Sequence, residues 1–221
     1  MKKLFFRPIL SQFVDRFTVL ISRFRFTESS AYWESRYRFQ GSSGAGSYGE
    51  HARKKAEFLN AFCREHQIAD VLEFGCGDGA QLELACYKDY IGLDVSQTAI
   101  KRCRRRFESN PTRKFYQLEE FRGATADLVL SLDVLFHLVE DSVFLRHLDS
   151  VFGSAQRFVV IFSTNHMDPP DRRATHVRHR AFTAICASRF PEFELFERPE
   201  QESSENDVRA GFYVFRRINS T

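Results

Sequence analysis

The sequence lacks several features that would place it in other classes of protein. Its five cysteines have no Cys-x-x-Cys spacing, which argues against a zinc site and fits a reducing compartment such as the cytoplasm. No apolar run approaches the length of a membrane span, and no internal repeat is visible. The net charge of +3 is too small to indicate nucleic acid as a partner. The 221 residues suffice for one α/β domain with an extension.

The most informative stretch is Val-Leu-Glu-Phe-Gly-Cys-Gly-Asp-Gly at residues 71–79. Its first four residues are typical of a short buried strand, and its three glycines allow a tight turn that brings the backbone close to a ligand. The apolar residues of segment 82–85 then predict a helix. Residues 90–93 predict a second strand that ends in Asp94, where an acid can accept hydrogen bonds from both hydroxyls of a ribose.

Residues 73–79 and Asp94 resemble the first two motifs of class I S-adenosylmethionine-dependent methyltransferases, and the resemblance runs from about Ala52 to Arg217. It implies a doubly wound, Rossmann-like α/β fold whose seven-stranded sheet ends in a C-terminal antiparallel hairpin. It also implies S-adenosylmethionine as the cofactor and S-adenosylhomocysteine as the product. The implied cofactor-binding residues are Glu73, Gly75, Cys76, Gly77, Gly79, Asp94, Val95, Leu118, Glu119, Ser131 and Asp133. An unrelated glycine turn and a nicotinamide-binding Rossmann domain are the alternatives, and Ala80 breaks the nicotinamide fingerprint.

Two regions are predicted, an extension at residues 1–49 and the methyltransferase-like domain at residues 50–221. Within residues 1–26, apolar side chains from Phe6 to Phe24 recur in steps of four and three on one helix face, among many basic residues. Arg7 and Arg16 interrupt any signal-peptide core. Three interpretations remain for this helix: packing on its own domain or on a second copy, peripheral contact with an anionic membrane, or a mobile arm.

Residues 27–49 combine aromatic residues with a glycine-rich run. We interpret them as a loop that folds over the cofactor or substrate, with Tyr32, Tyr37 and Tyr48 as candidate substrate contacts. The alternative is a flexible linker beside one packed aromatic cluster.

Helices and strands alternate through the remainder of the chain. Helices are predicted at residues 50–66, 97–107, 141–151 and 182–190, and strands at residues 114–118, 127–132, 157–162, 193–197 and 212–216. The last two strands would form the hairpin, around a polar loop at residues 198–209.

Four histidines near predicted strand ends are candidates for a catalytic general base: His137, His166, His176 and His179. Each also has a structural alternative, because such a histidine can pack in the core, cap a helix or lie at the surface. Arg178 and Arg180 could clamp a carboxylate or phosphate of the substrate. No cysteine or cluster of acids supports a histidine metal site, so no metal is expected.

The helix at 97–107 carries five basic residues, one lysine and four arginines, on its outer face. A solvated helix face is favoured over a nucleic-acid patch. The prediction is therefore methyl transfer to a small-molecule or saccharide acceptor, at oxygen because the histidines could deprotonate a hydroxyl. The alternatives are a non-catalytic binding or scaffold protein on the same fold, and a nucleic-acid methyltransferase.

Overall fold

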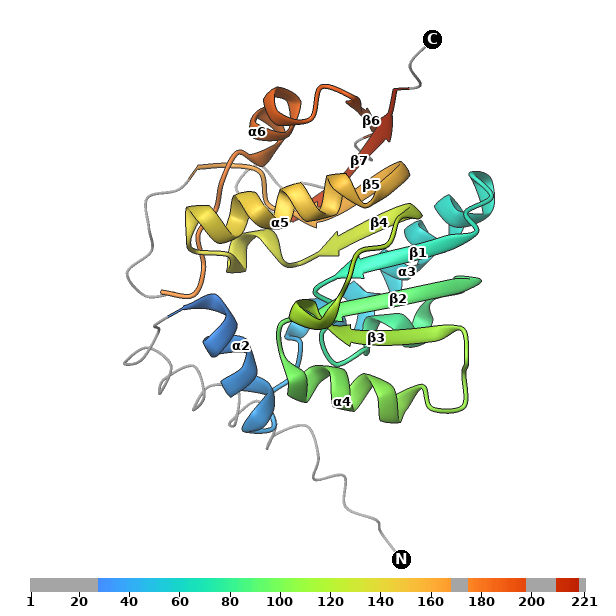
Figure 1. Ribbon diagram of the computed structural model, residues 1–221, viewed down its shortest axis with the longest axis vertical. Coiled ribbons are helices and arrows are strands. Elements are labelled where there is room, and N and C mark those ends of the chain that lie inside the picture. Colours follow the sequence, from blue (N-terminus) through green and yellow to red (C-terminus); the bar gives the residue numbers. More distant parts are fainter. Residues whose placement is uncertain (1–27, 168–174, 198–209, 219–221) are drawn as a thin grey trace, which may run out of the picture.

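The computed structural model describes residues 28–167, 175–197 and 210–218, which form a seven-stranded sheet with helices on both faces (Figure 1). The strands are β1 (Asp70–Phe74), β2 (Asp89–Asp94), β3 (Arg113–Gln117), β4 (Ala126–Leu132), β5 (Ala155–Ser163), β6 (Phe193–Glu197) and β7 (Gly211–Arg217). The α-helices are α2 (Ser29–Arg38), α3 (Gly49–Glu65), α4 (Gln97–Arg106), α5 (Asp141–Gly153) and α6 (Phe182–Arg189). The short 3₁₀ turns are η1 (Ala45–Ser47), η2 (Gln81–Leu84), η3 (Leu118–Glu120) and η4 (Leu135–His137).

The strand order is β3-β2-β1-β4-β5-β7-β6. The first five strands pair in parallel, whereas β7 pairs antiparallel with both β5 and β6. The chain order reverses between β1 and β4, which makes their carboxyl ends the expected place for a ligand crevice. The predicted doubly wound fold and its antiparallel C-terminal hairpin are confirmed.

Alternating side chains of the central strands build a separate apolar core on each face of the sheet. Val129 of β4 packs in the cluster that includes Phe144 and Leu148 of α5. Its neighbour Leu130 packs in the opposite cluster, with Leu59 of α3. Because both faces of β4 are covered, its centre is the uninterrupted apolar run Leu128-Val129-Leu130.

The predicted helices and strands are confirmed to within a few residues, but the helix expected at 82–85 is wrong. That segment forms only the 3₁₀ turn η2, and Ala85 is already extended at φ −91° and ψ 139°. Asn60 of α3 donates to the Leu84 carbonyl (2.9 Å) and accepts from the Cys86 amide (2.8 Å). This side chain satisfies the backbone groups that a longer helix would have used.

The helix α2 was not predicted, because residues 29–38 mix aromatic, polar and charged side chains without a clear apolar stripe. The predicted amphipathic helix at residues 1–26 and the predicted loop at 198–209 lie outside the described residues. The proposed division of the chain after residue 49 stays a prediction. None of the helices in the described ranges is long and apolar enough to cross a bilayer.

The connection from β3 to β4 is short, at residues 118–125, and contains only the turn η3. Parallel strands are usually joined by a longer crossover that forms a helix. Figure 1 shows this connection running along the sheet on the side of α5. Phe121 from this connection and Val143 of α5 both pack against the core cluster on that face.

Candidate active site

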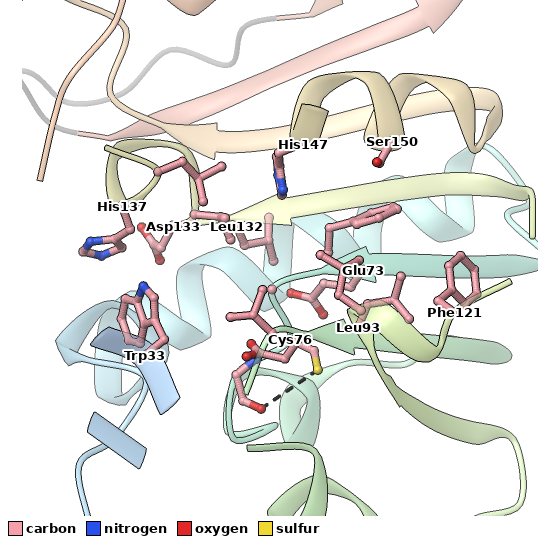
Figure 2. A pocket seen from close by; sticks show the side chains of 18 of the residues that line it. Trp33, Glu73, Cys76, Leu93, Phe121, Leu132, Asp133, His137, His147 and Ser150 are labelled. Atoms are coloured by element: carbon pink, nitrogen blue, oxygen red, sulfur yellow. Dashed lines mark hydrogen bonds between the residues drawn. The ribbon is translucent and has the colours of Figure 1, made fainter. Parts of the chain in front are cut away.

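A cavity of about 600 Å³ opens at the carboxyl ends of β1, β2 and β4 (Figure 2). Its lining includes Phe74, Asp94 and Leu132, the last residues of those three strands. This is the switch point at which open α/β sheets bind ligands, and the volume lies in the usual range for a small-molecule site.

The glycine turn after β1 forms one wall of the cavity. The amides of Gly75 and Cys76 both donate to the Leu93 carbonyl, at 2.7 and 3.0 Å, which ties the turn to the end of β2. Gly75 has a φ of +88°, and a Cβ added there would lie 2.4 Å from Cγ2 of Val134. Only glycine fits this position, because both the backbone angle and the neighbouring side chain exclude a larger residue.

Asp94 links the two turns that follow β1 and β2. Its carboxylate accepts hydrogen bonds from the backbone amides of Gly77 (3.0 Å) and Ser96 (2.8 Å). Burial raises the pKa of Asp94 to about 6, although these two hydrogen bonds act to lower it. The carboxylate also lines the cavity, so it is held in place for a ligand by the backbone of both turns.

Glu73 lies beneath the glycine turn and is almost wholly buried. The Tyr90 hydroxyl of β2 donates to its carboxylate at 2.5 Å. Burial raises the pKa of Glu73 to about 7, while the hydrogen bond from Tyr90 and the charge of Lys55 act to lower it. Glu73 and Cys76 both line the cavity, and Figure 2 shows them near one another.

A buried ion pair occupies the end of β4. Lys55 of α3, with a side chain only 3% exposed, donates to Oδ2 of Asp133 at 2.5 Å. Asp133 adopts a left-handed backbone conformation with φ +58°, and its amide donates to the Phe162 carbonyl. A non-glycine residue seldom takes this conformation, and such strain concentrates at functional sites. The ammonium of Lys55 also lies 5.1 Å from the centre of the Phe162 ring.

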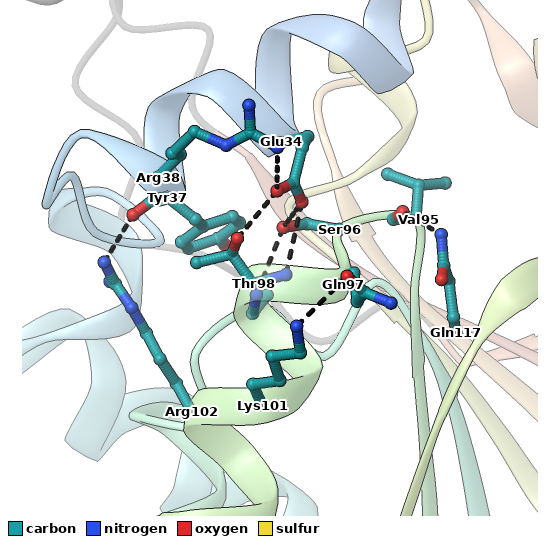
Figure 3. A network of polar contacts seen from close by, with 11 residues as sticks. Glu34, Tyr37, Arg38, Val95, Ser96, Gln97, Thr98, Lys101, Arg102 and Gln117 are labelled. Atoms are coloured by element: carbon teal, nitrogen blue, oxygen red, sulfur yellow. Dashed lines mark hydrogen bonds and ion pairs between the residues drawn. The ribbon is translucent and has the colours of Figure 1, made fainter.

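Residues 29–48, which we call the cap segment, cover the mouth of the cavity and are anchored to α4 (Figure 3). Glu34 accepts from the hydroxyls of Ser96 (2.6 Å) and Thr98 (2.7 Å), and from the Thr98 amide (3.2 Å). A carboxylate at this helix N-terminus also interacts favourably with the helix dipole. Arg102 donates to the carbonyls of Gly41 and Tyr37.

Asp78 of the glycine turn provides a second anchor for the cap segment. Its carboxylate accepts from the Ser43 hydroxyl (2.8 Å) and the Tyr48 hydroxyl (2.6 Å). At the other end of the cap segment, Ser29 donates from its hydroxyl to Glu140 at 2.6 Å, just before α5. The cap segment is thus attached on both sides of the cavity.

Residues 72–160 match a family model described as a methyltransferase domain. This segment contains the glycine turn, Asp94 and Asp133. The chain has the class I S-adenosylmethionine-dependent methyltransferase fold. The expectation from the two sequence motifs is therefore confirmed at the level of the fold.

The names of known proteins that are similar to this chain point to different acceptors. A mouse protein named eEF1A lysine and N-terminal methyltransferase is 27% identical over 143 residues, which are 60% of this chain and 20% of that protein. The chain thus spans about a fifth of the length of this relative. The N-methyltransferase NodS of Bradyrhizobium japonicum, in complex with S-adenosylhomocysteine, has a TM-score of 0.61 at 20% identity, over 76% of this chain and 87% of that one. Magnesium protoporphyrin IX methyltransferase of Synechocystis, with bound S-adenosylmethionine, has a TM-score of 0.56 at 17% identity, over 91% of this chain and 97% of that one.

Half of the predicted site residues line the cavity: Tyr37, Glu73, Gly75, Cys76, Gly77, Asp94, Val95, Leu118, Asp133 and His137. The other half do not line it: Tyr32, Tyr48, Gly79, Glu119, Ser131, His166, His176, His179, Arg178 and Arg180. Ser131 points to the face of α5, where its hydroxyl lies 2.9 Å from Nε2 of His147. The functional role of each of these residues stays a prediction.

His137 is the one histidine of the predicted four that lines the cavity. Its Nδ1 lies 3.2 Å from the His176 carbonyl, which can only accept, so Nδ1 carries the proton and Nε2 has the free lone pair. Burial lowers the pKa of His137 to about 3, so the ring is neutral at physiological pH. The Trp33 ring meets it edge-on at 4.8 Å.

The remaining candidates form a packed wall behind the cavity. His176 stacks on Tyr32 of the cap segment with ring centres 4.7 Å apart, and Nδ1 of His179 lies 2.6 Å from the Thr164 hydroxyl. Arg180 is buried and donates to the Leu138 and Val139 carbonyls, both at 2.7 Å.

Arg178 and Arg180 both bind Asp141 at the start of α5, each at 3.0 Å. The two guanidiniums therefore hold the loop between β4 and α5, which carries His137. Both arginines bind partners within the protein, whereas the sequence predicted that they would bind an anionic group of the substrate. Arg102 and Arg104 of α4 likewise use their guanidiniums on backbone carbonyls. The described chain has no group of three or more His, Cys, Asp or Glu residues that could hold a metal ion.

Sequence reasoning missed several residues that line the cavity: Trp33, Lys55, Gln81, Phe121 and His147. A signal existed for Lys55, because it lies three residues after Ala52 and four before Leu59, within the apolar stripe of α3. A lysine at such a position must be buried with a partner. His147 had no comparable signal, since its role depends on how α5 crosses the sheet.

Proposed function

We propose that the protein is an S-adenosylmethionine-dependent methyltransferase that methylates a small-molecule or saccharide acceptor at a hydroxyl oxygen. The observation that carries this proposal is the capped cavity, which joins a glycine turn, a strand-end carboxylate and a half-buried wall of His137 and Trp33. Methyl transfer needs mainly alignment of acceptor and donor, because S-adenosylmethionine supplies an already activated sulfonium methyl group when bound.

The residues present fit this cofactor. The Asp94 carboxylate faces the cavity and can accept from the hydroxyls of a ribose. At Gly75 a Cβ would meet Val134 at 2.4 Å, so the glycine lets the turn pack directly against Val134 in the lining of the cavity. Gln81 supports the fit as well, because its Oε1 is buried in the cavity lining without a hydrogen-bond partner in the described chain.

The cap segment favours a small acceptor. It closes the cavity from above through anchors on α4, Asp78 and Glu140, so a folded macromolecule could not reach the interior without displacing it. The basic face of α4 adds little support for nucleic acid, because Arg102 and Arg104 are engaged within the protein. An aromatic wall beside polar groups suits a sugar or another small polar ring.

Oxygen is the proposed methylated atom because His137 can accept the proton of an acceptor hydroxyl at Nε2. Methylation at nitrogen is the second candidate, and two observations favour it. The lowered pKa of His137 makes it a weak base, whereas a neutral amine needs no base in order to attack. The relatives named above include an N-methyltransferase and a lysine and N-terminal methyltransferase.

Incubation with methyl-labelled S-adenosylmethionine and a matched panel tests the function. The panel pairs methyl glucoside with methyl glucosaminide, and a simple alcohol with the corresponding amine. We expect label in the hydroxyl members, and a loss of about 100-fold in transfer for His137→Gln, as is usual for a general base. His51→Gln, exposed on α3, is the control. Label confined to the amines would establish nitrogen, and not oxygen, as the methylated atom. Binding of S-adenosylhomocysteine without any methyl transfer would favour a non-catalytic scaffold protein.

Binding of the product should depend on pH through Asp94. Burial raises its pKa to about 6, so the carboxylate is charged above pH 6 and protonated below it. A protonated Asp94 is a weaker acceptor for ribose hydroxyls, so the affinity for S-adenosylhomocysteine should fall about tenfold from pH 7 to pH 5. Calorimetric titration at several pH values measures this. Glu73 also titrates near pH 7, so Asp94→Asn is needed to separate the two, and an unchanged pH dependence in that variant would contradict the assignment.

A further inference from the structure

The cavity has a long arm that lies against one face of α5. The residues of α5 that line it recur in steps of three and four along the helix: Val143, His147, Ser150 and Gly153. Phe121, from the connection between β3 and β4, also lines the cavity and packs on the same core cluster as Val143. We call the part of the cavity between these five residues the α5 arm. At a helical rise of about 1.5 Å per residue, it follows α5 for about 15 Å.

The short connection between β3 and β4 explains why this space is open. A crossover between parallel strands usually forms a helix that packs on the sheet, but residues 118–125 form only the turn η3. Phe74 and Leu93, at the carboxyl ends of β1 and β2, are buried and lie in the floor of the cavity on this face. Ser150 and Gly153 are exposed, so the α5 arm also opens to the surface, away from the cap segment.

The polar groups of the α5 arm are already engaged within the protein. Nε2 of His147 lies 2.9 Å from the Ser131 hydroxyl, and the Ser150 hydroxyl donates to the Arg146 carbonyl at 3.0 Å. Burial lowers the pKa of His147 to about 4, so its ring is uncharged at physiological pH. The wall formed with Phe121 and Val143 therefore offers apolar contact and requires no polar partner from a ligand.

The α5 arm starts beside the proposed base and runs away from it. Helix α5 begins at Asp141, four residues after His137, whereas Ser150 lies in its third turn. Figure 2 shows Ser150 and Phe121 at the end of the cavity opposite to Trp33 and His137. A molecule at His137 can therefore extend along α5 without leaving the cavity.

We propose that the α5 arm binds an aliphatic chain of the acceptor, which is therefore an amphiphile with a hydroxyl-bearing head group. The head group lies beside His137, and the chain extends along α5. An extended chain suits a space that is long, follows one helix face and has an apolar wall. This inference rests on the proposed function, because it adds a second part to the same acceptor.

A series of alkyl glucosides tests this assignment. Methyl, butyl and octyl glucoside share one head group, and each is used below the concentration at which it forms micelles. Burial of one methylene group strengthens binding by about fourfold, so octyl glucoside should bind at least about tenfold more tightly than methyl glucoside. Calorimetry with saturating S-adenosylhomocysteine measures binding, and transfer of label from S-adenosylmethionine should show the same dependence of KM on chain length.

Ser150→Phe places a ring in the α5 arm from an exposed position, so the fold should tolerate it. This variant should bind octyl glucoside no better than methyl glucoside, and its affinities for methyl glucoside and S-adenosylhomocysteine should stay within about twofold of the wild type. Ser142→Phe is the matched control, because Ser142 is exposed in the first turn of the same helix and does not line the cavity. It should keep the full dependence on chain length.

The outcomes separate this inference from the proposed function. If octyl glucoside binds no better than methyl glucoside, or if Ser150→Phe keeps the dependence on chain length, the assignment is wrong even when methyl transfer is observed. A dependence on chain length that appears only without S-adenosylhomocysteine would also overturn it, because the cofactor would then occupy the α5 arm. Binding that depends on chain length without any transfer would support the α5 arm and contradict the proposed reaction.

Discussion

Asp94→Ala should weaken the binding of S-adenosylhomocysteine by about 100-fold, or about 2.7 kcal/mol. The carboxylate is placed to accept from two ribose hydroxyls, and each hydrogen bond to a charged acceptor is worth at least about 1.4 kcal/mol. The substitution also frees the amides of Gly77 and Ser96, which Asp94 now holds at 3.0 and 2.8 Å. The cavity would therefore lose both a ligand contact and part of its rigidity.

Titration calorimetry on three variants separates these two effects. Asp94→Asn keeps one carbonyl oxygen as an acceptor and should lose less affinity than Asp94→Ala. Asp89→Ala, at the exposed start of the same strand, should bind like the wild type. Wild-type affinity in a folded Asp94→Ala protein would show that the ribose is not held at the end of β2.

Gly77→Ala should displace the cap segment and weaken the binding of S-adenosylhomocysteine by at least about tenfold. A Cβ at this position would lie 2.3 Å from Oγ of Ser43 and 2.8 Å from the hydroxyl oxygen of Tyr37. Both atoms belong to the cap segment, and the Ser43 hydroxyl is also bound to Asp78 at 2.8 Å. Because these two oxygens are hydrogen-bonded to one another and the Ser43 hydroxyl is also held by Asp78, neither side chain can move away from the added methyl group without losing hydrogen bonds.

Gly49→Ala is a close control for this variant. Gly49 has a φ of +61°, against +58° at Gly77, but a Cβ there would meet nothing within 4 Å. Both substitutions carry the backbone cost of a left-handed alanine, about 1 kcal/mol, and only Gly77→Ala adds the collision. Limited proteolysis should cut the cap segment faster in Gly77→Ala than in Gly49→Ala. Equal rates and equal affinities would show that the cap segment does not depend on contact with the glycine turn.

The parts of this protein that could be predicted from the sequence are those controlled by neighbouring residues. Alternation and apolar runs identified all seven strands, because each strand buries its own side chains on one or both faces of the sheet. The glycine turn and Asp94 were also local features, since a positive φ and an acid at a strand end are both expressed within a few residues. The helix at 82–85 failed because its end is set by Asn60, which lies more than twenty positions away.

The tertiary structure alone decided which side chains share the cavity. His137 enters it, whereas His166, His176 and His179 pack behind it, although all four follow strands that end at the same edge of the sheet. Their positions depend on how the loop after β5 is tied to Asp141 through Arg178 and Arg180. These ion pairs join residues nearly forty positions apart, so they cannot be predicted from a pattern of neighbouring residues.

Lys55 illustrates both sides of this division. Its place in the apolar stripe of α3 determines that it is buried, because a helix turns every residue of that stripe toward the sheet. Its partner Asp133 was decided by the fold, which brings α3 against the end of β4. Burial follows from periodicity along one helix, but the identity of a buried partner depends on the packing of elements that are distant in the chain.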